Sequence, residues 1–144
     1  MVHALRQARR VLKSDGYLLD LRPAPVHRHV GIEYDGTYQL VTVMKESFDE
    51  DYAANRAIEA MVEAGLLKLV TRIRFDCTRR MDRFRDFDTW LDEYASLGKI
   101  HGDKHLLTKV REAVNSRRAA KTSRSKKAKI IVRGPVDLRV LVKR

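Results

Sequence analysis

Two charged residues at the end of a short apolar run are the first candidates for chemistry in this sequence. Asp20 and Arg22 end the run that begins at Tyr17, and such a run is typical of a buried strand, most often a parallel one. Ligands of open α/β sheets bind beyond the carboxyl ends of strands, so these side chains are candidates for acid–base catalysis or substrate binding. An ion pair or a cap of the strand end is the alternative interpretation, because the sequence shows no partner site.

A second candidate is a basic segment near the carboxyl end. Residues 117–129 contain seven basic side chains and no acidic one: Arg117, Arg118, Lys121, Arg124, Lys126, Lys127 and Lys129. Clustered lysines and arginines gain affinity for nucleic acid by releasing counterions from its phosphates. The segment has no aromatic side chain on which a base could stack, and serines and alanines separate its charges. Two interpretations stay open, a mobile solvated loop and a site for a polyanion.

Histidine and cysteine give little support for a metal site or a nucleophile. His27 and His29 are two residues apart, and His101 and His105 have the i, i+4 spacing of one helix face, but no glutamate completes a metalloprotease motif. Cys77 is the only cysteine, which excludes intramolecular disulfides and cysteine-rich zinc sites. It lies in an alternating apolar stretch without an activating base, so we expect a small buried side chain and no metal.

The composition is that of a single globular domain. The 144 residues are 44% hydrophobic and 34% charged, and the basic segment accounts for most of the net charge of +11. No apolar run reaches the length of a membrane span, and polar residues interrupt the first residues too often for a signal peptide. These features predict a soluble protein located in the cytoplasm.

Hydrophobic periodicity and turn residues predict the elements that position the candidates. Asp35-Gly36 between two alternating runs is a strong hairpin signal, and residues 47–50 match a capping box at a helix start. Phe87, Trp90 and Tyr94 are spaced as a core stripe on one helix. The expected elements are a helix over 4–12 that buries Leu5 and Val11, a strand over 17–21, a hairpin over 30–44, a helix over 48–64, a strand over 67–77, helices beginning at Asp86 or Asp88 and at Asp103, and a last strand over 130–142, with a bulge or a break into two strands at Gly134-Pro135.

The opening helix and strand resemble a piece of the class I S-adenosylmethionine-dependent methyltransferases. In that family a helix ending Arg-Val-Leu-Lys-Pro-Gly-Gly leads into the fifth strand, and Arg10-Val11-Leu12-Lys13 with Gly16 match this pattern, while Ser14-Asp15 departs from it. The resemblance implies an α/β to α+β fold class with a partial Rossmann-like sheet made of the last strands and their flanking helices. The hairpin over 30–44 and the helices over 86–115 would be additions.

The cofactor-binding half of that family has no counterpart here. A glycine-rich loop holds the cofactor because the backbone must approach it closely, and this sequence has no G-x-G among its seven glycines, Gly16, Gly31, Gly36, Gly65, Gly98, Gly102 and Gly134. We therefore expect no cofactor in this chain alone, and a remnant, a subunit or a substrate-side module without catalysis of its own. The alternatives are a small basic nucleic-acid-binding protein and a fragment of a longer enzyme.

The missing strands also predict a partner. A strand that has lost one neighbour exposes an edge able to pair with another chain. We expect the inserted hairpin, a second copy or a partner chain to cover this edge.

Overall fold

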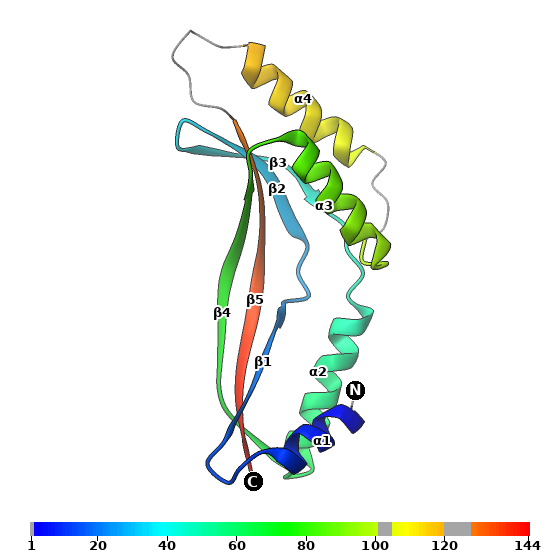
Figure 1. Ribbon diagram of the computed structural model, residues 1–144, viewed down its shortest axis with the longest axis vertical. Helices are drawn as coiled ribbons and strands as arrows, with labels where there is room; N and C mark the ends of the chain where they lie inside the picture. Colours follow the sequence, from blue (N-terminus) through cyan, green and yellow to red (C-terminus); the bar gives the residue numbers. More distant parts are fainter. Residues whose placement is uncertain (1, 101–104, 120–127) are drawn as a thin grey trace. The chain divides into compact units, whose positions relative to one another are not determined.

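The computed structural model describes residues 2–100, 105–119 and 128–144. Within them the chain forms four helices and a five-stranded antiparallel sheet, a mixed α/β fold (Figure 1). The residues divide into two compact units. Unit 1 holds the chain up to Val26, Phe48–Asp76 and Pro135–Arg144, and unit 2 holds His27–Ser47 and Cys77–Gly134. None of the described helices is both long enough and apolar enough to cross a membrane.

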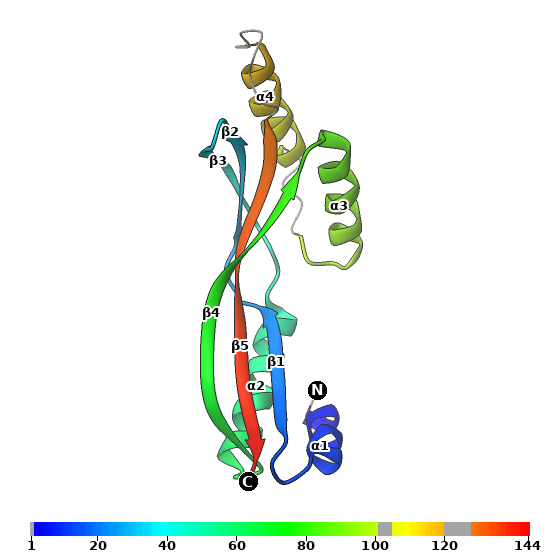
Figure 2. The same ribbon diagram turned by 60° about the vertical axis from the view of Figure 1, so that its left-hand side comes forward.

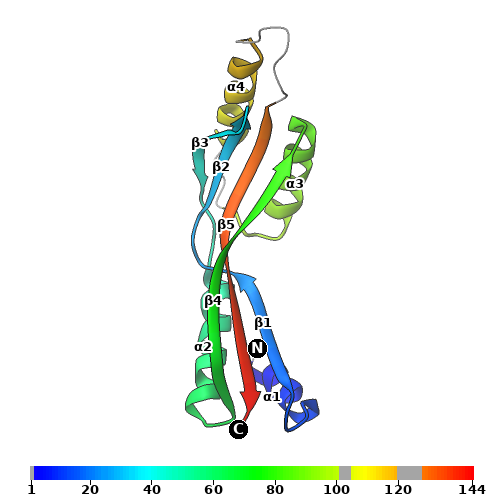
Figure 3. The same ribbon diagram turned by 90° about the vertical axis from the view of Figure 1, so that its left-hand side faces the viewer.

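Unit 1 contains β1 (Tyr17–Pro23), the part of β4 (Leu67–Met81) up to Asp76 and the part of β5 (Lys129–Lys143) from Pro135, and β5 lies between β1 and β4 (Figure 3). β1 pairs antiparallel to β5, from Tyr17 opposite Val142 to Pro23 opposite Val136. The expectation of a buried parallel strand is therefore wrong. Successive side chains of β1 alternate between exposed and half-buried, because only one face of this part of the sheet is covered.

Two helices cover that face (Figure 1). α1 (Val2–Val11) and α2 (Asp49–Glu63) pack with a small apolar core of Ile58, Met61, Leu67 and Leu141. Leu5 joins this core as predicted, but Val11 is 74% exposed because α1 ends there. The capping box predicted at 47–50 is wrong, since the N-cap residue of α2 is Phe48 and no side chain caps the helix.

The hairpin predicted in unit 2 is confirmed. β2 (Arg28–Tyr34) and β3 (Thr37–Met44) pair antiparallel around Asp35 and Gly36, which have φ angles of 49° and 77°. Positive φ at both central residues defines the tight turn whose twist suits a hairpin. β2 also pairs with the Lys129–Arg133 part of β5, so the hairpin does not cover the outer edge of β1, contrary to one expectation.

Helices α3 (Phe84–Ser96) and α4 (Leu106–Ala119) complete unit 2 (Figure 2). The predicted aromatic stripe is confirmed, because Phe87 is fully buried and Trp90 and Tyr94 pack against the same core. The N-cap of α3 is Arg83, so neither Asp86 nor Asp88 caps it. The core consists of Val30, Ile32, Met44, Met81, Phe87, Leu91, Leu106, Val110, Val114, Ile130 and Val132.

The last two strands differ from their predictions. β5 is one continuous strand through Gly134 and Pro135, because β1 pairs with it only from Val136 onward and β2 only up to Arg133. Pro135 lies between the two paired regions, so the backbone N–H that proline lacks is not needed for pairing with β1 or β2. Cys77 is exposed rather than buried, as is most of β4.

Candidate functional site

The two residues singled out in the sequence bind one another. The guanidinium of Arg22 donates from Nε and Nη2 to the two carboxylate oxygens of Asp20, at 2.7 and 2.8 Å. Both side chains lie on the face of β1 that α2 covers, opposite Arg139 and Asp137 of β5. The carboxylate is occupied by this two-pronged contact, so the ion-pair interpretation describes its geometry.

A third polar residue joins this pair to the neighbouring strand. Asn55 of α2 accepts hydrogen bonds at its Oδ1 from Arg22, at 3.2 Å, and from Arg139, at 2.8 Å. Arg139 is only 5% exposed, and among the described residues no carboxylate lies within ion-pair distance of it. Burial, and then the positive charges of Arg72 and Arg22, lower the pKa of Arg139, and the carboxylates of Asp20 and Asp137 oppose this only in part. The buried cation is therefore incompletely compensated.

Asp137 supplies the second negative charge of the cluster. It accepts hydrogen bonds from Arg72 at 2.6 Å and from Arg74 at 2.7 and 3.0 Å, both on β4. The hydrogen bond from Arg74 is the largest of the causes that hold the pKa of this carboxyl well below its usual range, against the opposing effect of burial. We call Asp20, Arg22, Asn55, Arg72, Arg74, Asp137 and Arg139 the arginine cluster, and it contains four cations and two anions.

A cavity of about 250 Å³ opens beside the arginine cluster. Arg72 and Arg139 reach it from the sheet, and its other lining residues come mainly from α2: Ile58, Glu59, Val62, Glu63 and Leu69. Guanidinium groups bind carboxylate and phosphate oxygens through paired N–H donors. The cavity can therefore hold a small molecule with an anionic group toward the two arginines and an apolar part against Ile58, Val62 and Leu69, with the carboxylates of Glu59 and Glu63 also in its lining.

Unit 2 has a buried ionic contact of a different kind. Glu46 is held by the guanidinium of Arg28, by the backbone N–H of Arg28 at 2.9 Å and by the hydroxyl of Tyr94 at 2.7 Å. Burial raises the pKa of Tyr94 to about 12, opposed by a hydrogen bond from Arg28 and reinforced by one to Glu46. Because both carboxylate oxygens of Glu46 and the hydroxyl of Tyr94 have partners within the triad, it links the hairpin to α3 and serves a structural role.

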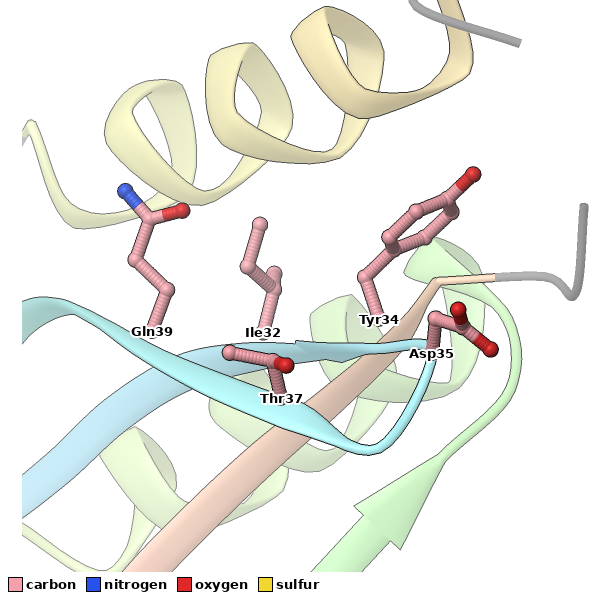
Figure 4. A pocket seen from close by; sticks show the side chains of 5 residues that line it. All are labelled: Ile32, Tyr34, Asp35, Thr37 and Gln39. Carbon is pink, nitrogen blue, oxygen red and sulfur yellow. The ribbon is translucent and has the colours of Figure 1, made fainter. Parts of the chain in front are cut away.

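A second cavity, of about 260 Å³, lies in unit 2 at the turn of the hairpin. Ile32, Tyr34 and Gln39 point from the hairpin toward α4, while Asp35 and Thr37 stand at the turn (Figure 4). Its only charged lining residue is Asp35, and it contains neither a histidine nor a cysteine, so we find no set of groups there for catalysis.

The other predicted candidates fall largely outside the described residues. Of the basic segment 117–129, the first three residues end α4 without described side chains, residues 120–127 are not described, and Lys129 lies 3.8 Å from Asp82 as the first residue of β5. His101 is likewise not described. Among the described residues no three His, Cys, Asp or Glu side chains gather as metal ligands.

The described glycines do not form a cradle for S-adenosylmethionine. A Cβ at Gly31 would meet the ring of Tyr38 at 2.5 Å, and Cβ atoms at Gly16 and Gly134 would meet the side chains of Leu12 and Arg28. Gly36, Gly65 and Gly98 have positive φ angles in turns. Each of these glycines thus meets a packing or a backbone need, and the chain as described does not fit the cofactor of the family it resembles.

Motifs in the sequence did not identify Asp137 and Arg139 as members of the arginine cluster, but one pattern could have indicated them. Asp137 and Arg139 alternate with Val136, Leu138 and Val140, so charged side chains occupy one face of a strand whose other face is apolar. The alternation alone does not show which face is covered, and in the structure α2 covers the charged one. No family model, curated protein or solved structure matches this chain.

Proposed function

We propose that this chain is the carboxyl-terminal, substrate-side part of a Rossmann-like methyltransferase fold that does not hold S-adenosylmethionine by itself. The arrangement of unit 1 is the observation that supports the proposal. Helix α1, strand β1 and helix α2 are followed by β4 and β5, and β5 lies between β1 and β4. In the family that residues 4–23 resemble, a helix follows the fifth strand and two antiparallel strands then close the sheet. The hairpin, α3 and α4 are additions in this scheme.

The cavity beside the arginine cluster has the substrate role in this proposal. Arg139 is buried without a carboxylate partner among the described residues, and Arg72 extends to the same cavity. An anionic substrate group would supply the missing negative charge there. The substrate class that follows is a small carboxylate or phosphate with an apolar portion.

Calorimetric titration tests both parts of the proposal. We expect the purified chain to show no heat of binding with S-adenosylmethionine or S-adenosylhomocysteine, and micromolar binding of either would contradict the absence of a cofactor site. For the cavity, phosphate and a medium-chain carboxylate are the probes. We expect Arg139→Gln to abolish the binding of these probes, whereas Arg56→Gln, on the exposed side of α2, should leave it unchanged. Equal binding by the two variants would exclude the cavity as the site.

A second candidate function, nucleic-acid binding, is favoured by arginines that lie over aromatic rings in unit 2. The guanidinium of Arg79 lies 5.8 Å from the ring centre of Trp90, and that of Arg111 lies 4.8 Å from the ring centre of Phe84. Guanidinium and aromatic planes both stack on bases. Binding of a single-stranded oligonucleotide should weaken steeply with salt and be reduced in Lys126→Ala/Lys127→Ala. Salt-independent binding, or none, would remove this candidate.

A further inference from the structure

The sheet of unit 1 has one face that no helix covers. The register of β1 on β5 places Tyr17, Leu19 and Leu21 on the same face as Val142, Val140 and Leu138. The opposite face carries Leu18, Asp20 and Arg22, and it is the one that α2 contacts through Asn55. On β4, Arg72 and Arg74 bind Asp137 on the α2 side, so Ile73 and Phe75 point the other way. Figure 3 shows the three strands side by side.

The side chains that β1, β5 and the middle of β4 contribute to this outer face are apolar and largely exposed. Tyr17 is 64% exposed, Leu19 64%, Leu21 59%, Ile73 49% and Phe75 45%, which are high values for large apolar side chains on a sheet. Between the two rows, Leu138 and Val140 of β5 are half-buried. The rows that β1 and β5 contribute contain no charged residue, and on β4 Lys68 lies on this side, because its neighbours Leu67 and Leu69 face α2. We call these seven side chains the outer apolar face.

This patch is large enough to form the centre of an interface. The exposed parts of its side chains amount to on the order of 500 Å², at the upper end of what a monomer exposes and often a functional surface. Each partner in a standard interface contributes about 800 Å², so the outer apolar face with its surrounding rim is enough for one stable contact. The apolar core on the α2 side is a small cluster of Ile58, Met61, Leu67 and Leu141, so burial of the outer apolar face would add substantially to the apolar area that this unit buries.

We propose that the outer apolar face is the dimer interface, and that a second copy of this chain covers it face to face. Two sheets with the same twist pack well on each other about 10 Å apart, which is the geometry of a β-sandwich. A two-fold axis would bring identical patches together, as in most homodimers. Because these seven side chains carry no charge, pairing them with their copies brings no like charges into contact, although each chain has a net charge of +11.

Sedimentation analysis of two matched leucine variants tests this interface. We expect the wild-type chain to have twice its monomer mass of 16.7 kDa at micromolar concentration. Leu19→Glu buries a charge in the proposed interface and should weaken the dimer by more than about 30-fold in Kd. Leu97→Glu makes the same change at a leucine of equal exposure, 66%, at the end of α3, and should leave the dimer intact.

A milder variant separates loss of the dimer from loss of the fold. Leu21→Gln keeps the size of the side chain and adds no charge, and it should also weaken the dimer while leaving the circular dichroism spectrum unchanged. A monomeric wild-type chain would overturn the proposal and assign the face to a different partner. Dimers that survive both Leu19→Glu and Leu21→Gln would overturn it as well, because the contact would then lie elsewhere.

Discussion

The two units distribute charged and apolar side chains across their sheets in opposite ways. In unit 2 the face under α3 and α4 is apolar, with Val30, Ile32 and Ile130 packed on Phe87. In unit 1 the face under α2 holds the arginine cluster beside a small apolar core, and a row of apolar side chains on β1 and β5, among them Leu19, Leu21 and Val140, points away from the helices. In both units the side chains of a strand alternate between the two faces of the sheet. The units differ in whether the helices cover the apolar or the charged face.

This difference shows which unit needs something outside itself. Among the described residues, unit 2 buries twelve apolar residues and satisfies its buried carboxylate, Glu46, from within, although the Tyr38 hydroxyl and Arg133 Nε are buried without a hydrogen-bond partner. Unit 1 buries seven, gives the buried Arg139 no ion pair, and exposes an apolar face. We infer that ligand binding and association both belong to unit 1, and that unit 2 is the better-packed part of the chain.

Matched phenylalanine truncations give the largest expected contrast between the units. Phe87→Ala should lower the free energy of unfolding by about 3–5 kcal/mol, because Phe87 is fully buried in the core of unit 2. Phe75→Ala should cost the monomer less than about 1 kcal/mol, because nearly half of that side chain is exposed. Urea unfolding at low protein concentration measures both. Similar losses for the two variants would show that the outer apolar face is packed within the monomer.

Removing the negative charge of Asp137 is the next largest effect. Asp137→Asn should cost about 2 kcal/mol at neutral pH, because it takes the anion from Arg72 and Arg74, each about half exposed, in a cluster already rich in cations. The matched control is Asp82→Asn, whose pair with Lys129 is 3.8 Å long and solvated, and it should cost less than about 0.5 kcal/mol. Urea midpoints compare the two variants. A cost for Asp137→Asn as small as the control would mean that the cluster adds nothing to stability.

Low pH should remove the contribution of the Asp137 carboxylate to the stability of the wild-type chain. The folded-state pKa of Asp137 lies below its ordinary value of 3.8, so its contribution is complete above that value and is lost as the pH falls toward the folded-state pKa. The stability difference between wild type and Asp137→Asn should be constant from neutral pH down to about pH 5 and shrink below about pH 4. A difference that stays constant into strong acid would contradict the ionic origin of the effect.

Local signals in the sequence predicted more of the fold than of the site. The hairpin could be predicted because Asp35 and Gly36 determine its turn without help from distant residues. The helix spacing of Phe87, Trp90 and Tyr94 likewise identified a core face. The arginine cluster could not be predicted from the sequence. Alternation of apolar and charged residues shows that a strand has two different faces, but it does not show which of them a helix covers. Asn55 and Asp137 are 82 residues apart in the chain, and only the fold brings both of them to Arg22 and Arg139.

The smallest expected effect on stability comes from the hydrogen bond between Tyr94 and Glu46 in unit 2. Tyr94→Phe removes the hydroxyl that donates to Glu46 at 2.7 Å, and it should cost about 1 kcal/mol at neutral pH because Arg28 still holds the carboxylate. The pKa of Tyr94 is raised from 10.0 to about 12, so its contribution is complete below pH 10 and is lost as the pH rises through 12.

The tyrosinate absorbance of the five tyrosines measures this ionisation directly. Tyr94→Phe should remove a step near pH 12 from this curve. If the variant removed no step near pH 12, Tyr94 would be solvated, and the triad with Arg28 and Glu46 would not be buried as the structure has it. Both units would then contain a polar cluster that is incompletely satisfied. The two units would differ only in the size of their apolar cores.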